Sequence, residues 1–98
     1  MLKHLVLFQI EGQTEAQETA MIAAFEGLVD TIPELHSLRM GRNVSPRDTT
    51  YSHALVSEHD DLDGCLAYVN HPAHQAAIAA HLAPYMKARA IVDFTTPA

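Results

Sequence analysis

Tyrosine and histidine are concentrated in one short block of the chain, Tyr68-Val69-Asn70-His71-Pro72-Ala73-His74. Two more of the 7 histidines, His4 and His53, fall in stretches whose sequence is typical of β-strands. Imidazole titrates near neutral pH and a phenol can orient or polarise a carbonyl group, so these side chains suit proton transfer without a cofactor. We therefore expect Tyr68, His74, His4 and His53 to be the catalytic residues, and we expect no cofactor.

Structural and metal-binding roles are the alternatives for this block. His71 could cap a broken helix, and His74 could pack beneath a loop. A zinc site could draw on His71 and His74, which are three residues apart, and on His81 seven residues later. No glutamate follows Glu58 to complete such a ligand set, and Pro72 separates the first two histidines. We therefore expect no dedicated metal site.

The other usual carriers of chemistry are missing. Cys65 is the only cysteine, which excludes an intrachain disulfide and agrees with a reducing compartment, so we expect a cytoplasmic protein. Cys65 falls on the apolar stripe of an expected helix, where a thiol is usually unreactive. The 4 glycines are scattered and form no phosphate-binding loop, and no serine lies in a hydrolase nucleophile motif.

Composition and charge exclude several classes of protein. Hydrophobic residues make up 48% of the 98 residues, which is typical of a folded domain. The 12 acidic and 6 basic residues give a net charge of −6, so no basic face can be assembled for nucleic acid. Apolar runs such as Leu5-Val6-Leu7-Phe8 are far shorter than the ~18 residues that a membrane span needs. We expect one soluble domain over residues 1–98 that binds neither nucleic acid nor membranes.

Capping and turn signals divide the chain into helices and strands. Thr14 and Gln17 fit a capping box at the start of the first helix, which Pro33 ends at about residue 31 or 32. Asp60 or Asp61 can cap a second helix, and Pro72 interrupts it and opens a further helical segment to about residue 81. The expected strands are residues 2–10, 35–44, 51–58 and 89–95. This order predicts an α+β, ferredoxin-like β-α-β-β-α-β fold with a four-stranded antiparallel sheet.

Apolar periodicity indicates which faces are buried. In the first strand, alternation places one set of side chains on a single face: Leu2, His4, Val6, Phe8 and Ile10. Leu5 and Leu7 fall on the opposite face, so the strand is apolar on both sides, as in a strand between two layers. The expected buried stripes of the helices are Met21, Phe25, Leu28 and Ile32 in the first, and Leu62, Cys65, Leu66 and Val69 in the second.

Such a sheet has helices on one face only and leaves the other face bare. We expect the bare face to carry Val6, Phe8, Ile10, Val92 and Phe94. An apolar patch of that size predicts association, and a two-fold pairing of sheet on sheet would bury it. The pattern therefore predicts a homodimer through the sheet face.

Six segments occur in a distinctive order: Lys3-His4-Leu5-Val6-Leu7-Phe8, Ile32-Pro33, Gly41-Arg42-Asn43-Val44-Ser45, Tyr51-Ser52-His53, residues 68–74 and Val92-Asp93-Phe94. Together they resemble the stress-responsive α/β-barrel (Dabb) domain family over essentially the whole chain. The resemblance implies a dimeric α+β barrel. By position, it matches Tyr68 and His74 to the tyrosine and catalytic histidine of a polyketide cyclase of that family, and His4 and His53 to its supporting histidines. Small residues follow the block where that cyclase has bulkier aromatic ones, which implies a differently shaped cavity: Ala76, Ala77, Ala79 and Ala80.

Three functions are open at this point. The first is a cofactor-independent, lyase-like cyclase in which His74 removes a proton next to a carbonyl group and Tyr68 hydrogen-bonds the carbonyl oxygen, with His4 and His53 in support. The second is a non-catalytic homodimer that binds a small ligand or protects against stress. The third is oxygen-dependent oxidation without a cofactor, as in related ferredoxin-like dimers.

Overall fold

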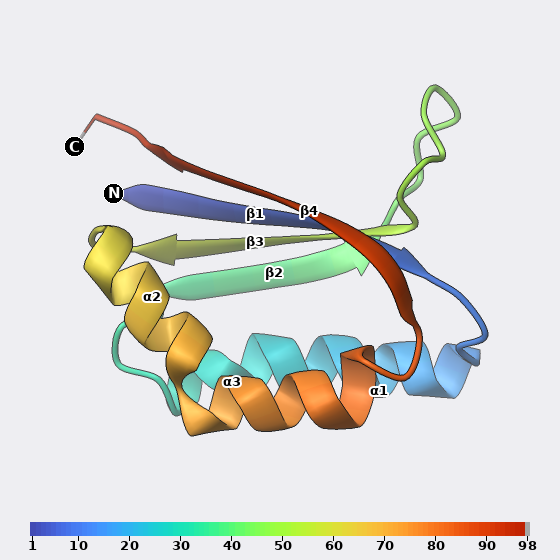
Figure 1. The fold of residues 1–98 in the computed structure, drawn as a ribbon, viewed down its shortest axis with the longest axis horizontal. Helices are drawn as coiled ribbons and strands as arrows, with labels where there is room; N and C mark the ends of the chain where they lie inside the picture. The colour runs from blue at the N-terminus through green and yellow to red at the C-terminus, as the bar shows by residue number, and fades with distance from the viewer. Residues whose placement is uncertain (98) are drawn as a thin grey trace.

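The computed structural model describes residues 1–97, and Ala98, the last residue of the expected domain, lies outside the described residues. Four antiparallel strands form one sheet in the order β2-β3-β1-β4. Three helices lie against one face of this sheet (Figure 1). The elements are β1 (Leu2–Ile10), α1 (Glu15–Glu26), β2 (Ser37–Arg42), β3 (His53–His59), α2 (Leu62–Asn70), α3 (Pro72–Ala77) and β4 (Met86–Thr95). The expected ferredoxin-like α+β fold is confirmed.

The start of α1 follows the sequence signal, but its end does not. The Thr14 hydroxyl accepts the backbone N–H of Gln17, and the Gln17 side chain accepts the N–H of Thr14, so the capping box is formed. The α-helix ends at Glu26 rather than at residue 31 or 32, and a 3₁₀ turn over Gly27–Asp30 follows it. Glycine has a poor helix propensity, which explains why the tighter turn starts there.

Strand ends also differ from the expected ones. The second strand covers Ser37–Arg42 rather than residues 35–44, because the Asn43 side chain donates to the carbonyls of Asp48 and Tyr51 and so closes a turn. The third strand runs from His53 to His59. The last strand begins at Met86, three residues earlier than expected, and a bulge beside it shifts the pairing with β1.

Helix α2 buries a different stripe from the expected one. Asp61 caps it by accepting the N–H of Gly64 at 2.8 Å, as one of the two predicted caps. Cys65 and Tyr68, three residues apart, are its buried residues, whereas Leu62 and Leu66 are about half exposed. Helix α2 lies at one end of the sheet (Figure 1) and contacts β1 and β3. The predicted stripe therefore holds for Cys65 and for Val69, which packs against the core, and is wrong for Leu62 and Leu66.

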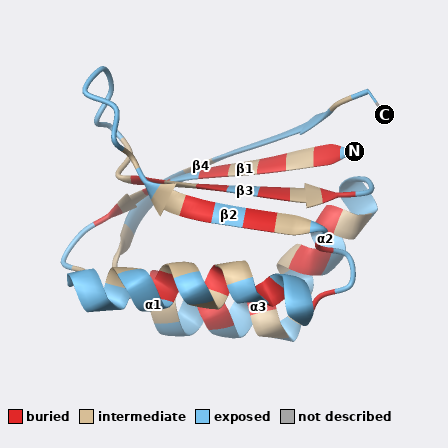
Figure 2. Ribbon diagram, turned by 180° about the vertical axis from the view of Figure 1, so that it is seen from behind, coloured by how far each residue is buried: buried red, intermediate tan, exposed pale blue. Residues whose placement is uncertain are grey.

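The expected alternation of β1 is present, but its assignment to the bare face was wrong. Val6, Phe8 and Ile10 belong to the buried core between sheet and helices. The bare face does carry Val92 and Phe94 as expected, together with Leu7 and Val56, all more than one third exposed. Buried residues lie on the helical side of β1, β2 and β3, whereas β4 is largely exposed (Figure 2). Both faces of β1 are apolar, so alternation alone could not show which one meets the helices.

No helix among residues 1–97 is both long and apolar enough to cross a lipid bilayer.

The core beneath the sheet is continuous from β1 through α1 to the turn after α1. The predicted stripe of the first helix, Met21, Phe25, Leu28 and Ile32, is buried throughout. This core holds the strands and helices in the arrangement that the cavity described next requires.

Candidate functional site

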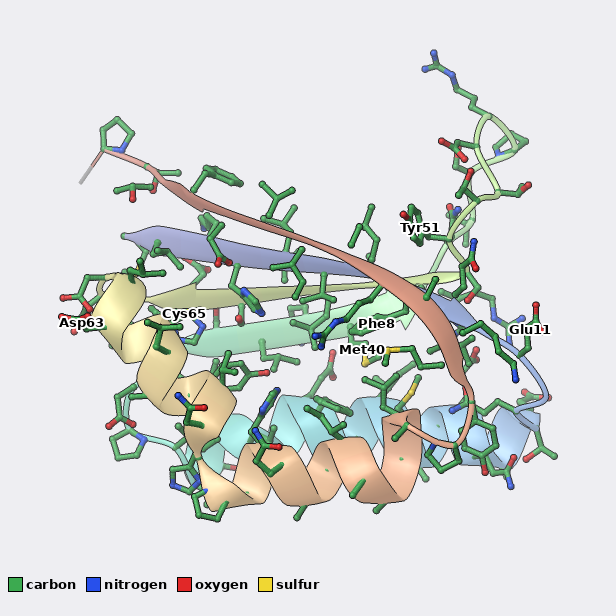
Figure 3. All side chains as sticks on the ribbon, viewed as in Figure 1. Phe8, Glu11, Met40, Tyr51, Asp63 and Cys65 are labelled. Atoms are coloured by element: carbon green, nitrogen blue, oxygen red, sulfur yellow. The ribbon has the colours of Figure 1, made fainter. Side chains whose placement is uncertain are left out.

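A cavity of about 390 Å³ lies between the sheet and the helices. Such a volume is within the range of small-molecule binding sites. Phe8 points from β1 toward the helices, and Cys65 lies on α2 at the end of the sheet (Figure 3). The lining residues come from both layers and are mostly apolar: His4, Val6, Phe8, Phe25, Leu55, Tyr68, Val69, His74, Gln75, Ile78, Leu82, Arg89 and Ile91. Three of the four predicted site residues are among them.

Tyr68, on α2, is the centre of a cluster of aromatic rings from several elements. Its ring centroid lies 4.4 Å from that of His74, 5.0 Å from that of His59 and 6.2 Å from that of His4. Burial raises the pKa of the Tyr68 phenol, so it stays protonated and can donate a hydrogen bond. Within residues 1–97, no protein group hydrogen-bonds to its hydroxyl. Tyr68 is fully buried in the single chain, so a bound molecule would reach its hydroxyl only from the cavity that the residue lines.

His74 lines the cavity, and only one of its two ring nitrogens is bound by the protein. Its Nδ1 donates to the backbone carbonyl of Val69 at 2.9 Å, which places the proton on Nδ1 and leaves Nε2 unprotonated in the neutral ring. Burial lowers the pKa of His74, so the ring is neutral near pH 7. Nε2 has no protein partner in the described part of the chain. A neutral imidazole with a free Nε2 can act as a general base.

His4 is held by a carboxylate that sequence reasoning had not assigned to the site. Its Nδ1 lies 2.5 Å from Oδ1 of Asp93, which is its direct partner in the pairing of β1 with β4. The ring stands edge-on to Tyr68, with an interplanar angle of 69°. Asp93 thereby fixes the ring orientation, and the His4 Nε2 has no hydrogen-bond partner among residues 1–97. Asp93 could have been predicted from strand alternation, because it is two residues from Ile91 and therefore lies on the same, cavity-facing side of β4.

His59 completes the cluster and was absent from the predicted site. Its Nδ1 donates to the carbonyl of Glu34 and its Nε2 accepts from the Ser57 hydroxyl, both at 2.9 Å. It is fully buried, and burial lowers its pKa, so the ring is neutral. With both nitrogens occupied, His59 can support the Tyr68 ring but has no free atom for chemistry. Its place on the His53–Leu55–Ser57 face of β3 could have been predicted from strand alternation.

His53 lies apart from the other predicted site residues. It pairs with Phe8, four residues along β1 from His4, which corresponds to ~13 Å along the strand. Its Nε2 lies 2.7 Å from the carboxylate of Glu18, and its Nδ1 lies 2.8 Å from the Ser52 hydroxyl. The structure thus brings Tyr68, His74 and His4 together and places His53 in a separate polar network with α1.

Within residues 1–97, His71, His74 and His81 form no cluster that could hold a metal ion. His71 has extended backbone between α2 and α3. Its Nδ1 accepts the N–H of Ala73 at 3.0 Å and so caps α3, which confirms the capping role considered for it. Among the described residues, ligand atoms of His4, Cys65 and Asp93 do lie within 4.8 Å of one another. Burial raises the pKa of the Cys65 thiol to about 11, so a metal would first have to displace its proton.

Comparison with known proteins places the chain among proteins of diverse chemistry. The sequence is 38% identical over 82 residues to an uncharacterized protein of Streptomyces coelicolor, covering 81% of this chain and 84% of that protein. It is 26% identical over 76 residues to olivetolic acid cyclase of Cannabis sativa, covering 74% of this chain and 75% of the cyclase. A solved dimeric ferredoxin-like protein of unknown function from Thermobifida fusca matches with a TM-score of 0.83 and 33% identity, over 97% of this chain and 90% of that one.

Two enzymes share the fold at lower identity. They are hydroxynitrile lyase from Passiflora edulis (TM-score 0.81, 20% identity, 98% and 96% of the two chains) and SnoaB, a cofactor-independent oxygenase from Streptomyces nogalater (TM-score 0.75, 16% identity, 99% and 93%). At these identities the likeness shows the fold alone.

The sequence pattern of the stress responsive A/B barrel domain matches residues 2–96. The chain therefore belongs to the stress-responsive A/B barrel (Dabb) domain family, as the sequence motifs had indicated.

Proposed function

We propose that this protein is a cofactor-independent enzyme that removes a proton next to the carbonyl group of a small substrate. The observation that carries the proposal is the pairing of Tyr68 and His74, whose ring centroids are 4.4 Å apart in the wall of a largely apolar cavity. The Nε2 of His74 takes the proton, and the electron pair of the broken C–H bond moves to the carbonyl oxygen. The Tyr68 hydroxyl donates to that oxygen as negative charge develops on it.

The enolate then has a natural next step if a second carbonyl lies within reach. Its carbon attacks the second carbonyl carbon and forms a C–C bond, and the electron pair of the attacked C=O becomes an alkoxide. The alkoxide takes the proton back from the His74 imidazolium, which regenerates the base. The match to olivetolic acid cyclase over 74% of this chain supports an aldol-type cyclisation of this kind.

The neighbouring side chains have positioning roles in this proposal. Asp93 orients His4, and His4 and His59 hold the Tyr68 ring between them. His53, retained from the sequence prediction as a supporting residue, acts on α1 through Glu18 rather than on the substrate. The apolar walls suit a small organic carbonyl compound, and they suit equally the alternative function of ligand binding without turnover.

Exchange of α-protons for deuterium in a simple ketone tests the base directly. We expect wild-type protein to catalyse exchange into 2-heptanone, followed by NMR, and His74→Gln to lose about 100-fold or more of that rate. His36→Gln is the matched control, since His36 is partly exposed and pairs with Asp60 outside the cavity. Exchange that survives in a folded His74→Gln variant would remove His74 from the mechanism. Saturable ketone binding without any exchange would favour the non-catalytic alternative.

A homodimer through the bare sheet face is the proposed assembly. Leu7, Val56, Val92 and Phe94 are exposed there in the single chain, and the similar Thermobifida fusca protein is dimeric. An apolar area of this kind is stable in water when a second copy covers it. Native mass spectrometry should give a dimer that Val92→Asp converts to monomer. Val44→Asp, at an exposed valine in the loop between β2 and β3, should leave the dimer intact.

A further inference from the structure

Arg89 is the one Lys, Arg, Asp or Glu side chain among the described residues that line the cavity. It lies on β4 directly opposite Phe8, on the same face of the strand as Ile91 and Asp93. No carboxylate of residues 1–97 lies within 4.0 Å of its guanidinium, and it makes no side-chain hydrogen bond to that part of the chain. Arg89 is exposed in the single chain, and its positive charge borders a largely apolar space without a protein partner among residues 1–97.

Three of the 6 basic residues pair with a carboxylate, whereas Arg47, Lys87 and Arg89 have none within 4.0 Å among residues 1–97. Arg42 forms a 2.8 Å ion pair with Glu18, Lys3 forms a 2.6 Å pair with Glu58, and Arg39 lies 3.8 Å from Glu26. An exposed arginine without a partner is common on a protein surface. The position of Arg89 in the cavity wall is what distinguishes it.

The pairing of β1 with β4 defines the layout of the cavity. His4 faces Asp93 at one level, Val6 faces Ile91 at the next, and Phe8 faces Arg89 at the third. The Tyr68 and His74 rings adjoin the His4 level. Arg89 is four residues from Asp93, which corresponds to ~13 Å along the strand. The cavity therefore has hydrogen-bonding groups at one end, apolar walls in the middle and a cation at the other end.

We infer that Arg89 binds the carboxylate of a linear oxo acid whose ketone lies at the Tyr68–His74 end. The ketone position rests on the proposed function, whereas the carboxylate position rests on Arg89 alone. A guanidinium binds a carboxylate through two parallel N–H donors, which gives both affinity and orientation. The apolar middle of the cavity matches a methylene chain between the two polar groups. The substrate class is thus an anionic, extended carbonyl compound rather than a neutral one.

Binding of 7-oxooctanoate and of its methyl ester separates charge recognition from apolar packing. By isothermal titration calorimetry, wild-type protein should bind the acid about 10-fold or more tightly than the ester. Arg89→Gln should reduce that ratio to about one, and Arg89→Lys should retain part of it. Arg47→Gln, an exposed arginine in the loop between β2 and β3, should keep the wild-type ratio. The ratio is taken within each variant, so a general loss of packing cancels.

Two results would overturn the inference: equal affinity of wild-type protein for acid and ester, or an unchanged ratio in Arg89→Gln. Failure of the proposed function has a different signature. In that case the acid is still preferred in an Arg89-dependent way, but His74→Gln and wild-type protein exchange the α-protons of the acid equally slowly. Conversely, His74-dependent exchange that is equal for acid and ester would keep the proposed function and reject the role of Arg89.

Discussion

Histidines lie at both ends of the central strand pair β1–β3, and the two ends use them differently. At the His53 end, both ring nitrogens have protein partners, Ser52 and Glu18, and Arg42 donates two further hydrogen bonds to the same carboxylate. At the His4 end, His59 is also bound through both nitrogens, but His4 and His74 each have one nitrogen held by an acceptor and one without a protein partner in the described chain. An oriented ring with a free lone pair in an apolar cavity suits proton transfer, whereas a ring bound on both sides suits structure. Hydrogen bonding therefore separates His4 and His74 from His53 and His59, which residue type alone does not do.

Matched replacement of the carboxylate at each end gives the largest expected contrast. Asp93→Asn replaces the charged acceptor that orients His4 by a neutral amide, and we expect the α-proton exchange rate to fall about 10- to 100-fold, as for other partners that orient a functional histidine. Glu18→Gln makes the same replacement at the acceptor of His53, and we expect the exchange rate to stay at the wild-type level. Circular dichroism checks that both variants are folded. An equal loss of rate in the two variants would abolish the distinction between the ends.

The pH dependence of exchange gives the next largest effect. Burial lowers the pKa of His74 below its usual value of 6.5, and the base must be unprotonated to act. The rate should therefore stay constant near neutral pH and fall about tenfold per pH unit only below that lowered pKa. Burial raises the pKa of Tyr68, so no loss is expected from phenol ionisation up to about pH 9. A midpoint clearly above pH 6.5 would show that another group is the base.

The sequence motifs predicted the neighbours at the His4 end of the sheet better than those at the His53 end. Tyr68 and His74 are close in sequence, so local helix geometry brings them together across the break at Pro72. His53 was grouped with them because it is a histidine on a strand. Its true neighbours depend on the pairing register of β1 with β3 and on the position of α1, which periodicity does not determine.

The same limitation explains the error about the sheet faces. Alternation correctly separated Val6 and Phe8 from Leu5 and Leu7, but both sets are apolar. Only the packing of α1 and α3 decides which set is covered within one chain. Asp93 and Arg89 were overlooked for a related reason: the β4 sequence looks like an ordinary edge strand until its pairing with β1 places both side chains beside the cavity.

Two serines provide a matched comparison of stability. Ser57→Ala removes the hydroxyl that donates to Nε2 of His59, and the fully buried ring nitrogen is left without a donor. We expect a loss of about 1–3 kcal/mol in the free energy of unfolding. Ser52→Ala removes the hydroxyl that contacts His53 Nδ1, accepts the N–H of Ile10 and donates to the carbonyl of Phe8. Ser52 is partly exposed, so water can take the place of the hydroxyl, and the change should cost about 1 kcal/mol or less. Urea denaturation of both variants measures the difference, and a larger loss in Ser52→Ala would contradict the assigned burial.

The smallest expected effect concerns the charge of Glu18. Hydrogen bonds from Arg42 and then His53 lower the pKa of this carboxyl below its usual 4.5. A lowered folded-state pKa contributes stability that is fully present above pH 4.5 and is lost as pH falls through the lowered value. Glu18→Gln should therefore reduce the free energy of unfolding by about 0.5–1 kcal/mol at pH 7, and less at high salt, since Arg42 is largely exposed.

Urea denaturation at several pH values tests this, because it measures how the gap in the free energy of unfolding between wild-type protein and Glu18→Gln changes with pH. The gap should shrink toward zero as the solution is acidified below the lowered pKa, because the wild-type carboxyl is then neutral like the amide. Glu11→Gln, at an exposed glutamate just after β1, controls for the loss of one negative charge and should show no such gap. A gap that is independent of pH would mean that Glu18 contributes through packing alone. The His53 end would then be held together without its ion pairs, and its contrast with the His4 end would rest on the cavity and not on how the imidazoles are bound.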